Sequence, residues 1–453
     1  MNKKILLIAA ACGAVFSLGA TAAPQEQTLA NGFKIVVERD TRSPVVVSQL
    51  WYRIGSVDEV NGHTGLSHLL EHMMFKGTPT VPDGEYSRRI AQAGGKENAF
   101  TSRDYTVYFQ QLAAKHLPLA MKLEADRMRN LSFSDDAFRR ELEVVKEERR
   151  WRTDDKPTGV LFEALYANAF MANPVRYPVI GWMDDLDHTK PDDARQWYRQ
   201  WYAPNNATLV VVGDVEPQAV FAEAQKQFGG LPAVALPERR PQQEPEQKGI
   251  RRVSVKAPSR LGFVAMAWQA PRLSRIDLAD PYGYFMLAEV LSGDSAGRLP
   301  RTLVREQSIA QSASANYDAL GRGGALFTII ASRAADKTDT ALEAAIRAQV
   351  ARIAKDGIGE QELERVRLQM DAERIYQRDS MFAQAMEIGT LESVGFSWRD
   401  QDTMRQRLRA VTPAEVQKAA AALIDDRLTV VTLTPQPVSR DTQNDIKGES
   451  FVR

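Results

Sequence analysis

The feature that most restricts the fold of this chain is an internal duplication, in which the same local patterns return in the same order. Three pairs of segments carry it: predicted helices at 137–150 and 362–375, helix starts at Lys190-Pro191 and Thr412-Pro413, and apolar strands at Thr208–Val212 and Leu428–Leu433. Their offsets drift only from 225 to 222 to 220 residues, which favours a duplicated domain over three coincidences. Each copy is predicted to span a little over 200 residues.

A proline-rich segment separates the two copies. Residues 232–249 contain four prolines among Glu, Gln and Arg and have no apolar periodicity. That composition is typical of an extended, solvated linker. We therefore predict a first domain at 23–231 and a second, homologous domain at 250–453.

Both domains are predicted to be α+β, each an antiparallel-rich sheet packed with helices. In the first domain the turn dipeptide Asn31-Gly32 precedes a strand at Phe33–Val37. A long strand follows at Val45–Ile54, and apolar residues alternate in a third strand near 105–109. Helical patterns separate these strands.

The first 22 residues have the pattern of a signal peptide. Lys3 and Lys4 precede an apolar run at Ile5–Leu18, and the small residues of Ala20-Thr21-Ala22 follow as a cleavage site. The pattern predicts export, with the periplasm as the expected location and secretion as the alternative. Cys12 is the only cysteine and lies in this leader, so the mature chain needs no disulfides. A lipoprotein attached through Cys12 is disfavoured because the apolar run continues well past it.

The overall composition excludes several classes of protein. The chain has 44% hydrophobic residues, so it is not disordered. It has 58 basic and 58 acidic residues, and no net charge favours nucleic acid or an anionic membrane. No stretch after the leader is long and apolar enough to span a membrane.

A histidine motif predicts a metal site. His68, Glu71 and His72 form an H-x-x-E-H pattern, and at 100° per residue they share one helix face. The opposite face is apolar and consists of Leu66, Leu69, Leu70, Met73 and Met74. The two histidines are therefore expected to project into a cleft, where they would hold one metal ion. Glu71 is better placed to accept a proton than to bind the metal. His63 is an alternative ligand, although its loop position favours a surface role.

A third ligand is expected from the predicted helix at 137–150. Glu141 and Glu148 fall on the same stripe as Phe138, Val144 and Val145. Carboxylates on the buried face of a helix are costly unless they are paired or bind a metal. One of the two is therefore a ligand candidate, and the other would support it. Salt bridges to arginines are the alternative explanation.

These motifs closely resemble those of the pitrilysin/insulinase-like inverted zinc peptidases. The nearest branch contains mitochondrial processing peptidase and its bacterial relatives. The match covers His68–Thr78, Gly94-Gly95, Asn98–Thr106, Val179–Trp182, Asn205–Thr208 and Val212–Asp214. The resemblance implies two similar α+β domains that form a clam-like pair around a cavity. It also implies that Glu148 is the third zinc ligand and that Glu141 is the supporting carboxylate.

The ligand set and the resemblance together predict a zinc-dependent endopeptidase with one Zn²⁺ per chain. Two imidazoles and one carboxylate leave an open position, where water acquires a pKa of about 7. Glu71 would accept the proton of that water and later pass it to the leaving amine. An extended peptide would pair with the predicted strand that contains Asn98, Ala99 and Phe100.

Three alternative functions were weighed. Gly293-Asp294-Ser295-Ala296-Gly297 fits the G-x-S-x-G motif of serine hydrolases, but a predicted helix precedes it and no histidine follows His188. Two histidines and a carboxylate also hold Fe(II) in oxygenases. Some relatives are non-catalytic assembly or chaperone-like subunits that have lost their ligands, whereas this chain keeps the complete set.

The second domain is predicted to carry no metal but to contact substrate. Val366 stands where Glu141 does in the first copy, and no histidine occurs in the second domain. In active relatives, an arginine and a tyrosine from the second domain or another subunit reach the site. Arg305 matches the arginine, but Gln311 replaces the tyrosine, with Tyr317 as a possible substitute. We therefore expect a dimer, formed either by two copies of this chain or with a related subunit that supplies an Arg/Tyr pair.

Overall fold

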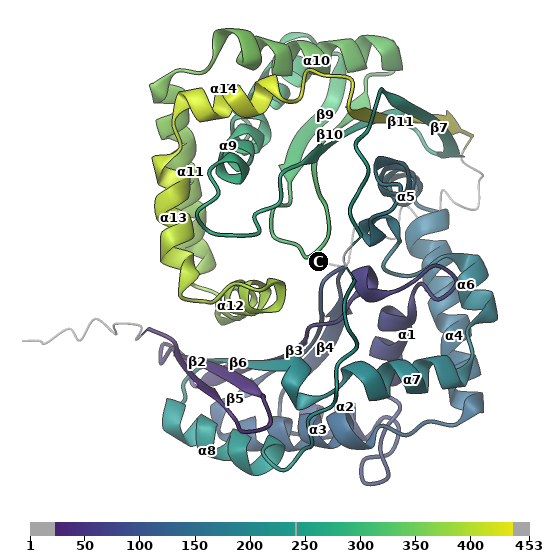
Figure 1. The fold of residues 1–453 in the computed structure, drawn as a ribbon, viewed down its shortest axis with the longest axis vertical. Helices are drawn as coiled ribbons and strands as arrows, with labels where there is room; N and C mark the ends of the chain where they lie inside the picture. Colours follow the sequence, from purple (N-terminus) through teal and green to yellow (C-terminus); the bar gives the residue numbers. More distant parts are fainter. Residues whose placement is uncertain (1–22, 241, 438–453) are drawn as a thin grey trace, which may run out of the picture.

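The computed structural model describes residues 23–240 and 242–437 and contains two β-sheets covered by helices. The predicted signal peptide, residues 1–22, lies outside the described residues. The two sheets lie in opposite halves of the molecule (Figure 1). None of the helices in the described part of the chain is long and apolar enough to cross a membrane.

Eleven strands build the two sheets of the described residues. The first sheet has the order β1-β2-β6-β3-β5-β4 and the second the order β7-β11-β8-β10-β9. The strands are β1 (Gln25–Thr28), β2 (Lys34–Arg39), β3 (Val45–Tyr52), β4 (Lys96–Thr101), β5 (Thr106–Ala113), β6 (Ala207–Gly213), β7 (Arg251–Pro258), β8 (Phe263–Ala270), β9 (Ala310–Tyr317), β10 (Ala325–Arg333) and β11 (Leu428–Gln436).

The helices divide between the same two halves. The first half contains α1 (Leu66–Met73), α2 (Glu85–Gln92), α3 (Leu117–Asn130), α4 (Asp135–Arg149), α5 (Pro157–Ala169), α6 (Met183–His188), α7 (Pro191–Trp201) and α8 (Pro217–Phe228). The second half contains α9 (Asp280–Ser292), α10 (Asp339–Asp356), α11 (Glu360–Gln377), α12 (Met381–Val394), α13 (Asp400–Ala410) and α14 (Pro413–Ala421). Short π-helical segments lie at η3 (Arg150–Asp154) and η6 (Pro300–Glu306).

The two sheets share one topology, as the sequence repeat predicts. The arrangement β2-β6-β3-β5-β4 matches β7-β11-β8-β10-β9 strand for strand, and β1 is an addition at one edge. In each sheet the first of these pairs is parallel and the other three are antiparallel. The predicted fold class, two similar α+β domains with antiparallel-rich sheets, is confirmed. The predicted helix before the G-x-S-x-G segment is also present, as α9.

The two halves exchange one helix each. One face of the first sheet packs on its own helices, whereas the other face packs on α12 of the second half through Ala385 and Ile388. Reciprocally, α5 of the first half packs on β7, β8 and β11 through Leu161 and Leu165. Figure 1 shows α12 beside the first sheet and α5 beside the second. Because each sheet alternates its side chains between two faces, both faces need a covering layer.

The segment between the halves is irregular but not fully solvated. Its described residues form no helix or strand. Arg239 donates to Asp58 at 2.7 Å, and the Glu244 carboxylate accepts three backbone N–H groups from residues 171–173. The buried Gln247 donates to the Leu428 carbonyl at 2.9 Å. These contacts fix the segment against both halves, so it differs from the solvated linker that its composition predicts.

Candidate metal centre

Helix α1 presents the histidine motif, and its first turn is fixed by a buried carboxylate. Gly65, with φ of 86°, precedes the helix, and a Cβ there would lie 2.6 Å from the Ile180 carbonyl oxygen. The fully buried Glu59 accepts the backbone N–H groups of Gly65 and Ser67 at 2.8 and 2.7 Å. The apolar stripe of α1 is buried, as expected, and all of it except Leu66 belongs to the core of the first half. The opposite face is thereby held toward a cavity.

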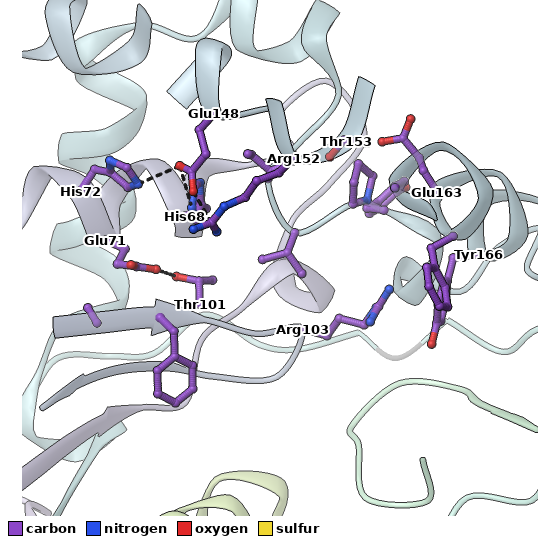
Figure 2. A pocket seen from close by; sticks show the side chains of 18 of the residues that line it. His68, Glu71, His72, Thr101, Arg103, Glu148, Arg152, Thr153, Glu163 and Tyr166 are labelled. Carbon is purple, nitrogen blue, oxygen red and sulfur yellow. Dashed lines mark hydrogen bonds and ion pairs between the residues drawn. The ribbon is translucent and has the colours of Figure 1, made fainter. Parts of the chain in front are cut away.

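His68, His72 and Glu148 converge in the structure. A carboxylate oxygen of Glu148, Oε2, lies 3.6 Å from Nε2 of His68 and 3.3 Å from Nε2 of His72. Figure 2 shows both imidazoles beside this carboxylate. Among the described residues, these three form the only group of His, Cys, Asp or Glu side chains with metal-binding spacing.

The arrangement fits a tetrahedral metal ion. Ligands about 2.1 Å from a zinc ion lie about 3.4 Å from one another in a tetrahedron, close to the separations of the carboxylate from the two imidazoles. Within the described residues, Glu148 Oε2 is buried without a hydrogen-bond partner. A buried, unsatisfied carboxylate oxygen is costly unless a cation completes it. Three donors also leave a fourth position open.

Glu141 supports His72 from behind. Its carboxylate lies 2.9 Å from Nδ1 of His72 and accepts from Nζ of Lys76 at 2.6 Å. A metal-binding imidazole commonly donates its second ring N–H to such a carboxylate, which fixes its orientation. The structure therefore separates the two glutamates that helix periodicity alone left equivalent, in the way that the resemblance implies: Glu148 faces both imidazoles, and Glu141 contacts one of them from the far side.

The exposure of α4 differs in part from the expected stripe. Phe138 and Val145 are buried, but Val144 is 50% exposed and Leu142 takes its place. Lys146 is also buried and pairs with Glu143 and Asp187. A lysine stem packs against apolar side chains while its ammonium group reaches acids, which polarity alone does not reveal.

The electrostatics of the centre favour a cation. Burial lowers the pKa of His68 to about 4, with repulsion from His72 as a further cause. Burial also lowers the pKa of His72, but the hydrogen bond with Glu141 and the nearby Glu148 carboxylate outweigh it and raise the pKa to about 9. The nearby His72 imidazole lowers the pKa of Glu148. Two carboxylates facing one imidazole thus stabilise positive charge, whether a proton or a metal carries it.

Glu71 lies beside this group but contacts a different partner. Its Oε2 accepts a hydrogen bond from Oγ1 of Thr101 at 2.5 Å (Figure 2). Burial raises the pKa of Glu71, partly offset by the Thr101 hydrogen bond. A carboxylate with a raised pKa is a better proton acceptor at neutral pH. Sequence reasoning did not single out Thr101, because a threonine in a strand carries no signal of its partner.

A cavity of about 810 Å³ contains the centre. Asn98, Ala99 and Phe100 line it from β4, the outermost strand of the first sheet, whose second edge has no strand partner. All of its lining residues come from the first half, between His68 and Ile180.

Arg305 lies elsewhere in this chain. It belongs to η6 of the second half and does not line the cavity. Gln311 is exposed on β9. Tyr317 is buried and donates its hydroxyl to the Pro271 carbonyl, so it does not substitute at the centre.

Comparison with known proteins identifies the family. Residues 34–182 match insulinase (peptidase family M16), and residues 189–370 match the peptidase M16 inactive domain. Zinc protease PqqE of Helicobacter pylori is 31% identical over 360 residues, which cover 78% of this chain and 80% of that protein. The chain belongs to peptidase family M16.

Other M16 proteins share the fold and much of the sequence. An uncharacterized zinc protease of Bacillus subtilis, YmxG, is 26% identical over 90% of this chain and 97% of its own length. The crystal structure of a protease from Helicobacter pylori superimposes with a TM-score of 0.86 and 28% identity, covering 91% of this chain and 99% of that one. The resemblance to the insulinase-like zinc peptidases is thus confirmed, and family membership favours hydrolysis over an iron oxygenase.

Proposed function

We propose that this M16 chain is an exported zinc endopeptidase that cleaves peptides or unfolded segments. The observation that carries the proposal is the convergence of His68, His72 and Glu148 at metal-ligand spacing, with Glu71 beside them. The relatives named zinc proteases support it. Export rests on the leader at 1–22 alone.

Each residue has a distinct role in this proposal. His68, His72 and Glu148 hold one zinc ion, and Glu141 orients His72. A zinc ion held by these residues would supply Lewis-acid chemistry, which polarises a peptide carbonyl and lowers the pKa of water. Glu71 accepts the proton of that water and returns it to the leaving amine, while Thr101 keeps its carboxylate directed into the cavity.

The free edge of β4 is the proposed binding surface for the peptide backbone. An extended peptide that pairs with Asn98, Ala99 and Phe100 becomes a seventh strand of the six-stranded sheet. Main-chain hydrogen bonds then hold the peptide largely independently of its sequence. Thr101, at the end of the same strand, places the peptide beside Glu71.

We further propose that the chain acts as a dimer, either with a second copy of itself or with a related subunit. The cavity lining contains no residue of the second half, and Arg305 lies outside it. A subunit that brings an Arg/Tyr pair to the open side would supply the missing support for the oxyanion. Adding such a subunit should raise the rate by about 10²–10³. A fully active monomer that Arg305→Ala inactivates would overturn this part.

Metal content and peptide cleavage test the proposal together. The wild-type chain should hold one zinc, and chelation should abolish cleavage. Glu71→Gln should keep the zinc but lower kcat by about 10²–10⁴, because only the proton acceptor is removed. His68→Ala should lose the zinc as well.

Glu147→Gln is the matched control, since Glu147 is an exposed glutamate one residue before Glu148. It should match the wild type in zinc content and in rate. Full activity of Glu71→Gln would contradict the role of the base, and chelator-resistant cleavage would contradict the metal mechanism. A second zinc in residues 250–453 would contradict the metal-free second half.

A further inference from the structure

Outside the metal centre, the cavity lining contains more basic than acidic side chains. Arg103, Arg152 and Arg176 line the cavity, and Glu163 is the one acid in the lining besides Glu71 and Glu148. Glu163 forms its ion pair with a different arginine, because both of its carboxylate oxygens accept hydrogen bonds from Arg149, at 2.7 and 3.1 Å. Arg152 pairs with Glu148 at 2.8 Å.

Arg103 and Arg176 are left without an acidic partner within 4.0 Å among the described residues. Each is anchored by a carbonyl instead. Nε of Arg103 donates to the Val175 carbonyl at 3.3 Å, and its guanidinium lies 3.9 Å from the ring centre of Tyr166. Nη1 of Arg176 donates to the Met171 carbonyl at 2.6 Å, and its buried Nε has no partner in the described part of the chain.

Asp104 and Asp318 lie near Arg103, whose charge partly offsets the rise that burial causes in the pKa of each, but neither carboxylate forms an ion pair with it. Oδ1 of Asp104 accepts the backbone N–H of Arg322 from the second half at 2.7 Å, and the Arg322 side chain lies 3.6 Å from the same oxygen. Arg103 therefore keeps its two Nη groups available for another partner.

A guanidinium held over an aromatic ring has less freedom to move, and its N–H pair matches the geometry of a carboxylate. Figure 2 shows Arg103 extending toward Tyr166, on the side of the cavity away from His72. The carbonyl that anchors Arg103 belongs to Val175, which directly precedes Arg176, so the two arginines share one anchoring segment.

We propose that Arg103 and Arg176 bind a carboxylate of the peptide substrate, near the scissile bond. The carboxylate is an acidic side chain or the C-terminus of the peptide, and the chemistry of recognition is the same for both. This inference rests on the proposed peptidase function and names its substrate class.

The position of Arg103 in the chain sets the expected distance from the scissile bond. Arg103 follows Thr101, the last residue of β4 and the partner of Glu71, by two residues. An extended peptide on β4 advances about 3.3 Å per residue. The preferred carboxylate should therefore lie within about three residues of the cleaved bond.

Matched peptides test this inference. One neutral parent peptide is compared with variants that carry Asp or Asn at each of three positions on either side of the cleaved bond, with free or amidated C-termini. At one position the wild-type enzyme should show a kcat/KM ratio of Asp to Asn peptide of about tenfold or more, since hydrogen bonds to charged groups have that effect. If amidation rather than Asp→Asn removes the preference, the carboxylate is the C-terminus, which also supports the site.

Substitutions that change the charge of Arg103 or Arg176 test whether these two residues bind the carboxylate. Arg103→Gln and Arg176→Gln should bring the Asp/Asn ratio toward one, whereas Arg103→Glu should favour a Lys peptide over the Asp peptide. A misfolded variant loses activity but cannot reverse the preference between the Asp and Lys peptides. A reversal would therefore show that Arg103 recognises the charge of the substrate. Arg139→Gln, which changes an exposed arginine of α4, is the control and should retain the wild-type ratio.

The outcomes separate this inference from the proposed function. If no peptide is cleaved in a metal-dependent manner, the proposed function fails. If cleavage is metal-dependent but the Asp/Asn ratio is near one at every position and amidation has no effect, only the carboxylate site fails. A preference that persists in Arg103→Glu would also overturn the assignment of Arg103.

Discussion

Gly389 of α12 lies directly against the indole ring of Trp51 in β3, although the two residues belong to opposite halves of the chain. An added Cβ at Gly389 would overlap the indole, so only glycine permits this approach. Trp51 in turn contacts the rings of Phe100 and Tyr105, with centroids 6.4 and 4.8 Å away. The contact between the halves therefore reaches the strand that borders the candidate site.

Gly389→Ala should destabilise the protein by about 1–3 kcal/mol, because overpacking forces α12 away from the sheet. Helix propensity alone predicts that this substitution stabilises the protein, since alanine is about 1 kcal/mol more favourable than glycine in a helix interior. Urea unfolding measures the difference. Gly230→Ala, where an added Cβ meets nothing within 4 Å, should leave stability nearly unchanged. Equal stability of Gly389→Ala and the wild type would show that the halves do not depend on this contact.

Arg322→Ala should weaken the second contact between the halves. Arg322 donates to both oxygens of Asp58 at 2.8 and 2.6 Å, and both side chains are largely buried. Removing one partner of a buried ion pair costs about 3–5 kcal/mol, and the remaining bond from Arg239 to Asp58 places the loss at the low end. Chemical denaturation measures it, with Arg275→Ala at an exposed ion pair as the control. A similar loss of unfolding free energy in both variants would show that the buried Arg322–Asp58 pair does not hold the two halves together.

Glu141→Gln should lower zinc affinity about 10–100-fold, because His72 loses the carboxylate that orients it. Competition with a chelator of known affinity measures this without any need for activity. Glu143→Gln, on the exposed part of the same helix, should bind zinc like the wild type. Unchanged zinc affinity in Glu141→Gln would mean that Glu141 acts only as the ion-pair partner of Lys76 and does not orient His72.

Glu59 should make stability depend on pH. Burial raises the pKa of Glu59 from 4.5 to about 7, although the N–H groups of Ser67 and Gly65 lower it in part. The folded state thus holds the proton more tightly than the unfolded state. The contribution of Glu59 to stability is fully present below about pH 4.5 and is lost as the pH rises to about 7, by about 3 kcal/mol at most.

The free energy of unfolding, measured from pH 4.5 to 7.5 for the wild type and Glu59→Gln, checks this expectation. The difference between the two should change across this range and level off above pH 7, because glutamine does not titrate. A constant difference would mean that Glu59 titrates alike in the folded and unfolded states.

The sequence by itself determined the local structure and the duplication. The H-x-x-E-H motif lies on the polar face of α1 because the 3.6-residue period of a helix separates polar from apolar positions. The same logic was less successful on α4. There a few apolar residues did not define the stripe, so the exposed Val144 was misplaced and the burial of Lys146 was not predicted.

Only the tertiary structure decided which distant side chains meet. The exchange of α5 and α12 depends on the path of the chain between the sheets, and the apolar pattern of either helix is the same whichever sheet it covers. For the same reason helix periodicity alone left Glu141 and Glu148 equivalent until the family resemblance distinguished them, and no pattern paired Thr101 with Glu71 or Arg103 with Tyr166. The periodicity of a sequence shows which positions of a helix or strand are polar. The partners of each side chain are set by long-range packing, which no local pattern encodes.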